Sequence, residues 1–203
     1  MNLIKRMLLM VLAALTALAL FGCAKPNADG DPQQTEAALT EEQTARIEFL
    51  AEAFARFGPC DMKNGLTLSW MERIIPCVWA GRLEECELEG FCKVTLEEAD
   101  ATVDSVFKGM EIPDYTRKKY DASQDQEYFL LNGYYYMKLA KPLTARIDSV
   151  KPFEDAETGA ERVRATVSVF EEGELMTVVT MELAPDAESC YSVVRTELND
   201  YMK

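Results

Sequence analysis

The sequence contains no histidine among its 203 residues. Ser-His-Asp and Cys-His nucleophile pairs need an imidazole to accept a proton near neutral pH, and most zinc sites and proton shuttles use one too. These kinds of catalytic and metal site are therefore excluded. Acid and base chemistry in this chain would have to use carboxylates, lysine or tyrosine.

Basic residues are scarce, with 21 Lys and Arg against 35 Asp and Glu and a net charge of −14. Binding to nucleic acid draws on clustered Lys and Arg, and an acidic chain is repelled by phosphate backbones and anionic lipid head groups. The basic cluster Arg117-Lys118-Lys119 lies in a polar stretch that is typical of a solvated loop. We expect no nucleic-acid partner.

A hydrophobic run long enough to cross a membrane is also missing. The stretch from Met7 to Leu20 has 14 apolar or small residues, whereas a spanning helix needs roughly 20. It follows the charged pair Lys5 and Arg6 and precedes Gly22 and Cys23. A charged start, an apolar centre and a small residue before a cleavage point are typical of an export signal.

The residues Leu20-Phe21-Gly22-Cys23 resemble the lipobox of bacterial lipoproteins, although Phe21 stands where a small residue is usual. The resemblance implies that residues 1–22 are a lipoprotein signal peptide and that Cys23 becomes an acylated N-terminus. Membrane lipid is then a partner through Cys23, because two or three acyl chains hold a protein firmly on a bilayer. The implied location is the cell membrane, facing outside the cytoplasm. The alternative is an ordinary secretory signal with a chance cysteine.

The segment after the signal has the composition of a linker. The signal holds Lys5, Arg6 and no acidic residue, so its removal leaves 181 residues with 19 basic and 35 acidic side chains, a net charge of −16. From Ala24 to Leu39, Pro, Gly, Asp, Asn and Gln predominate without an apolar period, and such segments bury too little surface to fold. We predict a flexible tether over residues 23–39 and a single domain over residues 40–203.

Paired C-x-x-C motifs are absent, so we expect no structural zinc site, and we predict no metal and no cofactor. Besides Cys23 there is an odd number of cysteines: Cys60, Cys77, Cys86, Cys92 and Cys190. Export permits disulfides, and the candidate pairs are Cys86 with Cys92 and Cys60 with Cys77. Cys190 lies in a predicted strand and is expected to be a small buried hydrophobe.

Capping boxes mark the start of two predicted helices, at Thr40 with Gln43 and at Thr95 with Glu98. The first helix ends before Gly58, and each helix carries its apolar residues on one face. These residues are Ile47, Leu50, Phe54 and Phe57 in the first helix and Leu96, Ala99, Val103, Val106 and Phe107 in the other.

A further helix is predicted between these two, over residues 66–81. Pro76 lacks an N–H donor and clashes with the preceding turn, so this helix should end or kink near Ile75. Its tryptophans, Trp70 and Trp79, could anchor a partner, but large aromatic residues beside apolar neighbours usually pack in the core. All three helices lie within residues 40–108.

Residues 127–198 change from a helical to an alternating period. Asn132-Gly133 between the apolar runs of residues 128–138 predicts a hairpin with a type I′ turn. Further strands are predicted at residues 143–150, 162–171, 174–183 and 189–198. Val163, Ala165, Val167 and Val169 alternate with polar residues, which indicates a sheet with one dry face. The short links imply an antiparallel meander.

Helices followed by antiparallel strands predict an α+β domain with its helices packed on a curved antiparallel sheet. The order from Thr40 to Leu198 is similar to cone-shaped nuclear transport factor two-like and cystatin-like domains of small exported bacterial lipoproteins. The segments TLEEADATVDSVFKG and YFLLNGYYY also resemble lipoproteins of Gram-positive anaerobes. Such folds host enzymes, ligand pockets and interaction modules, so the fold alone assigns no function.

Four tyrosines lead to the first functional hypothesis, a binding or scaffold module at the cell envelope. They are Tyr128, Tyr134, Tyr135 and Tyr136, and tyrosine offers apolar area with a polar tip to a glycan, an envelope protein or a small ligand. Alternation places Tyr134 and Tyr136 on one face and Tyr135 on the other, so part of this cluster should pack in the core.

The second hypothesis is a pocket enzyme of nuclear transport factor two-like type. It would use the concave sheet as a cavity and Asp148 or Glu182 as a base with a pKa raised by burial. No spacing singles out these two residues, and outward-facing charges on a half-wet sheet explain them better than a catalytic role does. Because no nucleophile and base motif is present, a binding module is the favoured function.

Overall fold

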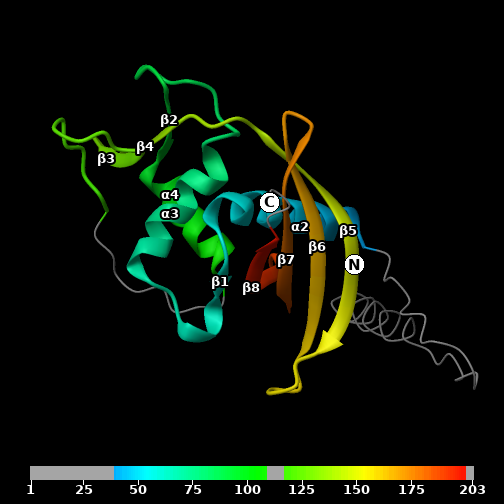
Figure 1. Cartoon of the computed structure of the whole chain (residues 1–203). Coiled ribbons are helices and arrows are strands. Elements are labelled where there is room, and N and C mark those ends of the chain that lie inside the picture. The colour runs from blue at the N-terminus through cyan, green and yellow to red at the C-terminus, as the bar shows by residue number, and fades with distance from the viewer. Residues whose placement is uncertain (1–38, 109–116, 200–203) are drawn as a thin grey trace, which may run out of the picture. The chain divides into compact units, whose positions relative to one another are not determined.

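The computed structural model describes residues 39–108 and 117–199 of the chain (Figure 1). These residues belong to one compact unit, Glu36–Lys203. The predicted signal peptide, Cys23 and the tether up to residue 38 lie outside the described residues. Within the described ranges, no helix combines the length and apolar character needed to span a bilayer.

The elements follow the predicted order of helices before strands. The helices are α2 (Glu41–Phe57), the 3-10 helix η2 (Met62–Asn64), α3 (Leu68–Trp79) and α4 (Leu96–Val106). The strands are β1 (Cys60–Asp61), β2 (Phe91–Thr95), β3 (Tyr128–Leu131), β4 (Tyr134–Lys138), β5 (Leu143–Glu154), β6 (Glu161–Glu171), β7 (Glu174–Asp186) and β8 (Cys190–Asn199).

The strands form two antiparallel sheets, a five-stranded one in the order β1-β8-β7-β6-β5 and a three-stranded one in the order β2-β4-β3. The α+β class and the antiparallel meander β5 to β8 are thus confirmed, but the single sheet was wrong. The hairpin β3-β4 pairs with β2, with Phe91 opposite Lys138 and Thr95 opposite Tyr134. Because β2 pairs with the other edge of β4, the hairpin and β2 form a second sheet, separate from the five-stranded one.

Helix α2 covers one face of the larger sheet, as the predicted apolar stripe requires. It contacts β5, β6, β7 and β8 (Figure 1). Ile47, Leu50 and Phe54 of α2 are fully buried, as are Val167 and Val169 of β6. Burying one such side chain contributes about 1.5 to 3 kcal/mol, so this interface is a main source of stability.

The capping box predicted at Thr40 is present. The Thr40 hydroxyl accepts a hydrogen bond from the Gln43 N–H at 3.1 Å, and the Gln43 side chain accepts one from the Thr40 N–H at 2.9 Å. Replacing Thr40 by alanine should lower the free energy of unfolding by about 1 kcal/mol, because an N–H group at the start of α2 loses its partner. Urea denaturation measures this change, with T40S as the conservative control. Equal stability of T40A and the wild type would contradict the role of the cap.

The helix predicted over residues 66–81 is present as Leu68–Trp79 and contains Pro76, so of the two predicted alternatives, an end or a kink near Ile75, the end was wrong. Pro76 has no N–H to offer to the carbonyl group of Glu72, four residues earlier. The hydroxyl group of Tyr135, from β4, donates a hydrogen bond to that carbonyl oxygen at 3.3 Å. The acceptor that proline leaves unpaired is therefore satisfied by another element.

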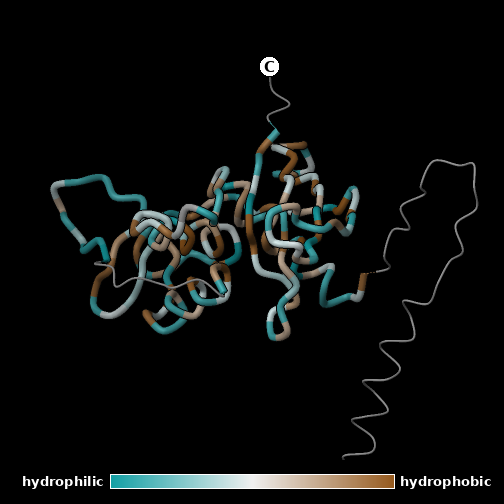
Figure 2. Tube along the Cα trace, turned by 90° about the horizontal axis from the view of Figure 1, so that it is seen from below, coloured by the Kyte–Doolittle hydropathy of each residue, from teal (hydrophilic) through white to brown (hydrophobic). Residues whose placement is uncertain are grey.

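Two tight turns join the strands where the sequence predicted them. Asn132 and Gly133 have φ values of 50° and 81°, and Glu172 and Gly173 have values of 52° and 85°. Positive φ at both central residues matches the twist of the flanking strands. Along the trace, polar and apolar residues alternate over short distances (Figure 2), which fits strands that bury one face only.

Candidate functional site

A pocket of about 470 Å³ opens among the end of α2, the second half of α3 and the β3-β4 hairpin. Its polar and reactive lining residues are Arg56 from α2, Arg73 and Cys77 from α3, and Glu127, Tyr128 and Lys138 around the hairpin. Small-molecule sites in proteins typically have volumes of roughly 300 to 1,000 Å³. The pocket is therefore large enough for a small organic ligand.

Two arginines fix the electrostatic character of this pocket. Arg56 donates a hydrogen bond to the carbonyl oxygen of Lys141, and Arg73 donates one to the carbonyl oxygen of Phe57. The Arg73 guanidinium also lies over the Phe57 ring, 4.7 Å from its centroid. Burial lowers the pKa of Arg56, but a guanidinium stays charged at neutral pH.

The thiol of Cys77 lies beside these two arginines. Burial raises its pKa from 9.0 to about 11, although the charges of Arg73 and Arg56 act in the opposite direction. Since the thiolate is the nucleophile, a thiol that is protonated at neutral pH is unreactive. The arrangement can bind a ligand but does not activate this sulfur for covalent chemistry.

The raised thiol pKa values predict a loss of stability at high pH. Burial raises the pKa of both Cys60 and Cys77 from 9.0 to about 11. The folded state then holds these protons more tightly, so their contribution is fully present below pH 9.0 and is lost as the pH rises towards about 11. Urea denaturation across this range should show a smaller pH-dependent loss for C77S than for the wild type. The half-buried Cys86 provides the control variant C86S, and an unchanged pH dependence in C77S would contradict the assignment.

The four predicted tyrosines occupy different surroundings. Tyr128 is half-buried, lines the pocket and stacks on Tyr135 with 5.9 Å between ring centroids. Tyr135 is 0% exposed, and Tyr136 is 6% exposed and stacks on Phe129. The expectation that part of the cluster packs in the core is confirmed. Tyr135 belongs to the buried part of the cluster, and a ligand-binding role for the four tyrosines stays a prediction.

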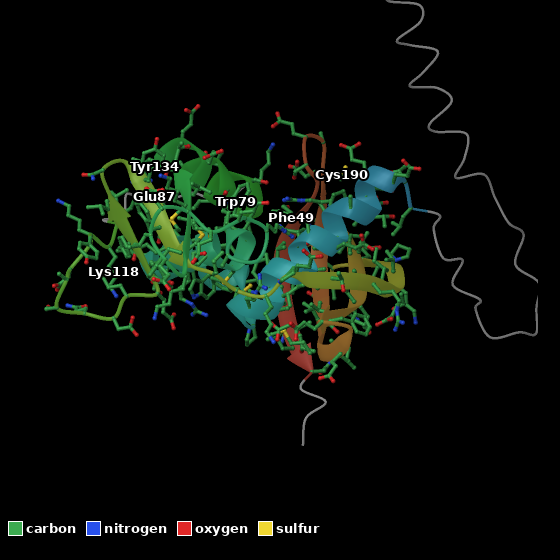
Figure 3. The ribbon with its side chains drawn as sticks, turned by 90° about the horizontal axis from the view of Figure 1, so that it is seen from above. Phe49, Trp79, Glu87, Lys118, Tyr134 and Cys190 are labelled. Carbon is green, nitrogen blue, oxygen red and sulfur yellow. The ribbon has the colours of Figure 1, made fainter. Side chains whose placement is uncertain are left out.

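Tyr134, the fourth tyrosine, lies in a surface cluster near Glu87 (Figure 3). The Lys93 ammonium lies 4.7 Å from the centroid of the Tyr134 ring and 2.6 Å from the Glu87 carboxylate. The hydroxyl of Tyr136 donates a hydrogen bond to Glu87 at 2.8 Å. Hydrogen bonds from Lys93, the backbone and Tyr136 lower the pKa of Glu87 to about 2. Lys93 is thus the cation that contacts both the Tyr134 ring and the Glu87 carboxylate.

The tryptophans pack as predicted. Trp79 donates its indole N–H to the Thr102 hydroxyl at 2.8 Å, and Trp70 contacts the Phe57 ring edge-on at 5.9 Å between centroids. Trp79 and Phe49, both labelled in Figure 3, line a shallow groove whose volume is about 250 Å³. Both indoles are half-buried, so their main role is to hold the helices together.

The predicted catalytic bases lie on the face of the large sheet that points away from α2. Asp148 pairs with Arg146 at 3.3 Å and accepts a hydrogen bond from the Ser168 hydroxyl at 2.6 Å. Ser168 follows Val167, which faces α2, and successive residues of a strand point to opposite faces. Asp148 therefore does not lie between α2 and the sheet, where the enzyme hypothesis places the cavity and its catalytic base.

Glu182 lies on the same outer face, opposite Arg164, with which it pairs at 2.8 Å. It lines a depression of about 320 Å³ together with Arg164, Thr180, Arg195 and Glu197. The two remaining charged residues of this depression, Arg195 and Glu197, pair with each other at 2.7 Å. The charges of the depression are matched internally, so nothing there favours a catalytic base.

The cysteines differ from the predicted pairing. Within the described residues, Cys60, Cys77, Cys86, Cys92 and Cys190 are all free thiols, so neither predicted disulfide is formed. The Cys60 sulfur lies 3.2 Å from the Thr196 hydroxyl, and the Cys92 sulfur points to the Met137 carbonyl at 3.6 Å. Cys190 is half-buried rather than buried as predicted.

Sequence reasoning missed the arginines of the pocket. Arg56 and Arg73 come from different helices, and no local motif connects them. Comparison of the chain with protein-family models, with curated proteins and with solved structures finds no match. The functional argument therefore depends on the geometry of the pocket and on the residues that line it.

Proposed function

We propose that this protein is a lipid-tethered binding module that faces outside the cytoplasm and takes a small ligand into the pocket beside α3. The anchor in this proposal is the acylated Cys23, and the tether is residues 23–39. The observation that carries the binding function is the pocket of about 470 Å³, into which two helices and the hairpin bring Arg56, Arg73 and Tyr128.

The same proposal includes the finer fold class, a cone-like domain of the nuclear transport factor two-like or cystatin-like kind. It is supported by α2 coming first in the described chain and lying against the meander β5 to β8. The space between α2 and this sheet is filled by the fully buried residues Leu50, Phe54, Val167 and Val169. Ligand binding in this domain therefore uses the pocket beside α3 instead.

A fragment screen by protein-observed NMR tests the binding function. The screen uses neutral, cationic and anionic compounds with the mature chain, and the reporters are the backbone amide signals around Cys77, Tyr128 and Leu139. We expect some of the compounds to shift these signals, with smaller or no changes at the outer face of β6. A screen in which no compound of any charge shifts the pocket signals would overturn the proposed function.

A further inference from the structure

The pocket contains two arginines, Arg56 and Arg73, in a chain whose overall charge is negative. The sequence has a net charge of −14, and most cations among the described residues lie within 4 Å of an acidic group, for example Arg82 with Glu52. Among those residues, Arg56 and Arg73 form no ion pair of this kind. An acidic protein thus presents in one pocket two guanidinium groups that lie within 4 Å of no carboxylate of the described residues.

Each of these guanidinium groups is held in place by a contact that uses only part of its donors. Arg56 donates to the Lys141 carbonyl, and Arg73 donates to the Phe57 carbonyl while stacking on the Phe57 ring. A guanidinium carries five N–H donors in a planar fork. The remaining donors suit a carboxylate or phosphate group, which arginine binds through two parallel hydrogen bonds.

The rim of the pocket limits the charge of a ligand. Lys138 pairs with Asp125 at 2.7 Å, and both side chains are well exposed, so this pair is weak and can rearrange. Glu127 is exposed and also lines the pocket. Its carboxylate would repel a ligand with several negative charges, which favours a single anionic group.

The rest of the lining is apolar. Tyr128 is fixed by stacking on Tyr135, and Pro76, Ala80 and Leu139 complete this part of the wall. Leu139 is 37% exposed, which leaves apolar surface that a ligand would cover. Contact with such a wall favours an organic body over a bare inorganic ion.

On these grounds we infer that the pocket binds a small organic anion, in which one carboxylate or phosphate group meets Arg56 and Arg73 and an apolar body meets the wall formed by Tyr128, Pro76 and Leu139. This inference rests on the proposed function and specifies its ligand chemistry. A carboxylic acid and a phosphate monoester share that chemistry, and the experiment separates them.

The test titrates the mature chain with four probes: benzoate, phenyl phosphate, the neutral benzamide and inorganic phosphate. NMR shifts at the pocket and isothermal titration calorimetry give the affinities. We expect benzoate or phenyl phosphate to bind, and benzamide and inorganic phosphate to bind at least roughly tenfold more weakly, because each lacks one half of the recognition. The stronger of the first two probes identifies the anionic group.

Variants locate the binding. R73Q should weaken the preferred anion roughly tenfold or more, since a charged hydrogen-bond donor is removed, and R73K should weaken it less. The matched control R146Q removes the same charge on the outer sheet face and should leave the affinity unchanged. If circular dichroism shows that R73Q is unfolded, the rim variant K138Q, which alters an exposed pair, gives a second measurement of how a pocket cation affects the affinity for the anion.

The outcomes distinguish this inference from the function on which it rests. If benzamide binds as well as benzoate, or if R146Q weakens binding as much as R73Q, the anion specificity is overturned while the pocket remains a binding site. Failure of both organic anions to shift the pocket signals, when other fragments shift them, has the same meaning. Failure of every compound overturns the proposed function as well.

Discussion

Replacing Tyr135 with alanine should lower the free energy of unfolding by about 3 to 5 kcal/mol, the range for removing a large buried aromatic side chain. Tyr135 is 0% exposed, stacks on Tyr128 and donates a hydrogen bond to the Glu72 carbonyl that Pro76 leaves unpaired. The substitution would therefore leave a cavity and an unsatisfied acceptor. Equilibrium unfolding in urea measures the change.

Two control variants separate these contributions. Y135F keeps the ring and removes the hydroxyl, so it should cost about 1 to 3 kcal/mol. Y134A changes the next residue along β4, which is 39% exposed, and should cost less than about 1 kcal/mol. If Y134A destabilises the protein as much as Y135A does, the orientation of β4 described above is wrong.

Replacing Cys23 with serine should move nearly all of the protein from the membrane fraction to the soluble fraction outside the cytoplasm. Each buried CH₂ of an acyl chain contributes about 0.8 kcal/mol, so losing the chains removes the whole anchor in the proposed function. Fractionation of cells that produce each variant measures the distribution. C190S, which changes a thiol of the folded domain, should remain in the membrane fraction.

Mass spectrometry of the purified native protein gives a second reading of the same prediction. It should find an N-terminus at Cys23 that carries a thioether-linked diacylglycerol. An uncleaved Met1, or an unmodified sulfur at Cys23, would contradict the anchor. Membrane retention of C23S would contradict it as well.

The parts of the fold that the sequence predicted correctly are those set by neighbouring residues. Thr40 with Gln43 and Thr95 with Glu98 form the predicted capping boxes, because the interacting groups lie only three residues apart. Asn132 with Gly133 forms the predicted turn for a similar reason, since the positive φ values are local preferences.

The features that were missed depend on contacts between distant segments. Helix α3 continues past Pro76, and a tyrosine 63 residues away donates a hydrogen bond to the Glu72 carbonyl that the proline leaves without its usual partner. Strand β2, only five residues long, is recognisable through its pairing with β4. Neither effect leaves a pattern in the local sequence, so periodicity and proline rules could not predict them.

In the candidate site too, features set by neighbouring residues were predicted and features set by distant contacts were missed. Tyr128 was predicted because tyrosines are conspicuous in the hairpin, yet its neighbours Tyr135 and Tyr136 are core residues. Arg56 and Arg73 lie 17 residues apart in the chain, on different helices. Only the packing of α2 against α3 brings them to one pocket. Only the folded structure shows that, among the described residues, neither arginine forms an ion pair with a carboxylate.

A crystal structure of the mature protein soaked with the tighter-binding of benzoate and phenyl phosphate tests the central claim most directly. The account predicts that the anionic group lies within hydrogen-bonding distance of the Arg56 and Arg73 guanidinium groups, with the ring against Tyr128 and Leu139. An empty pocket at saturating ligand, or a ligand whose charged group points to solvent, would contradict it.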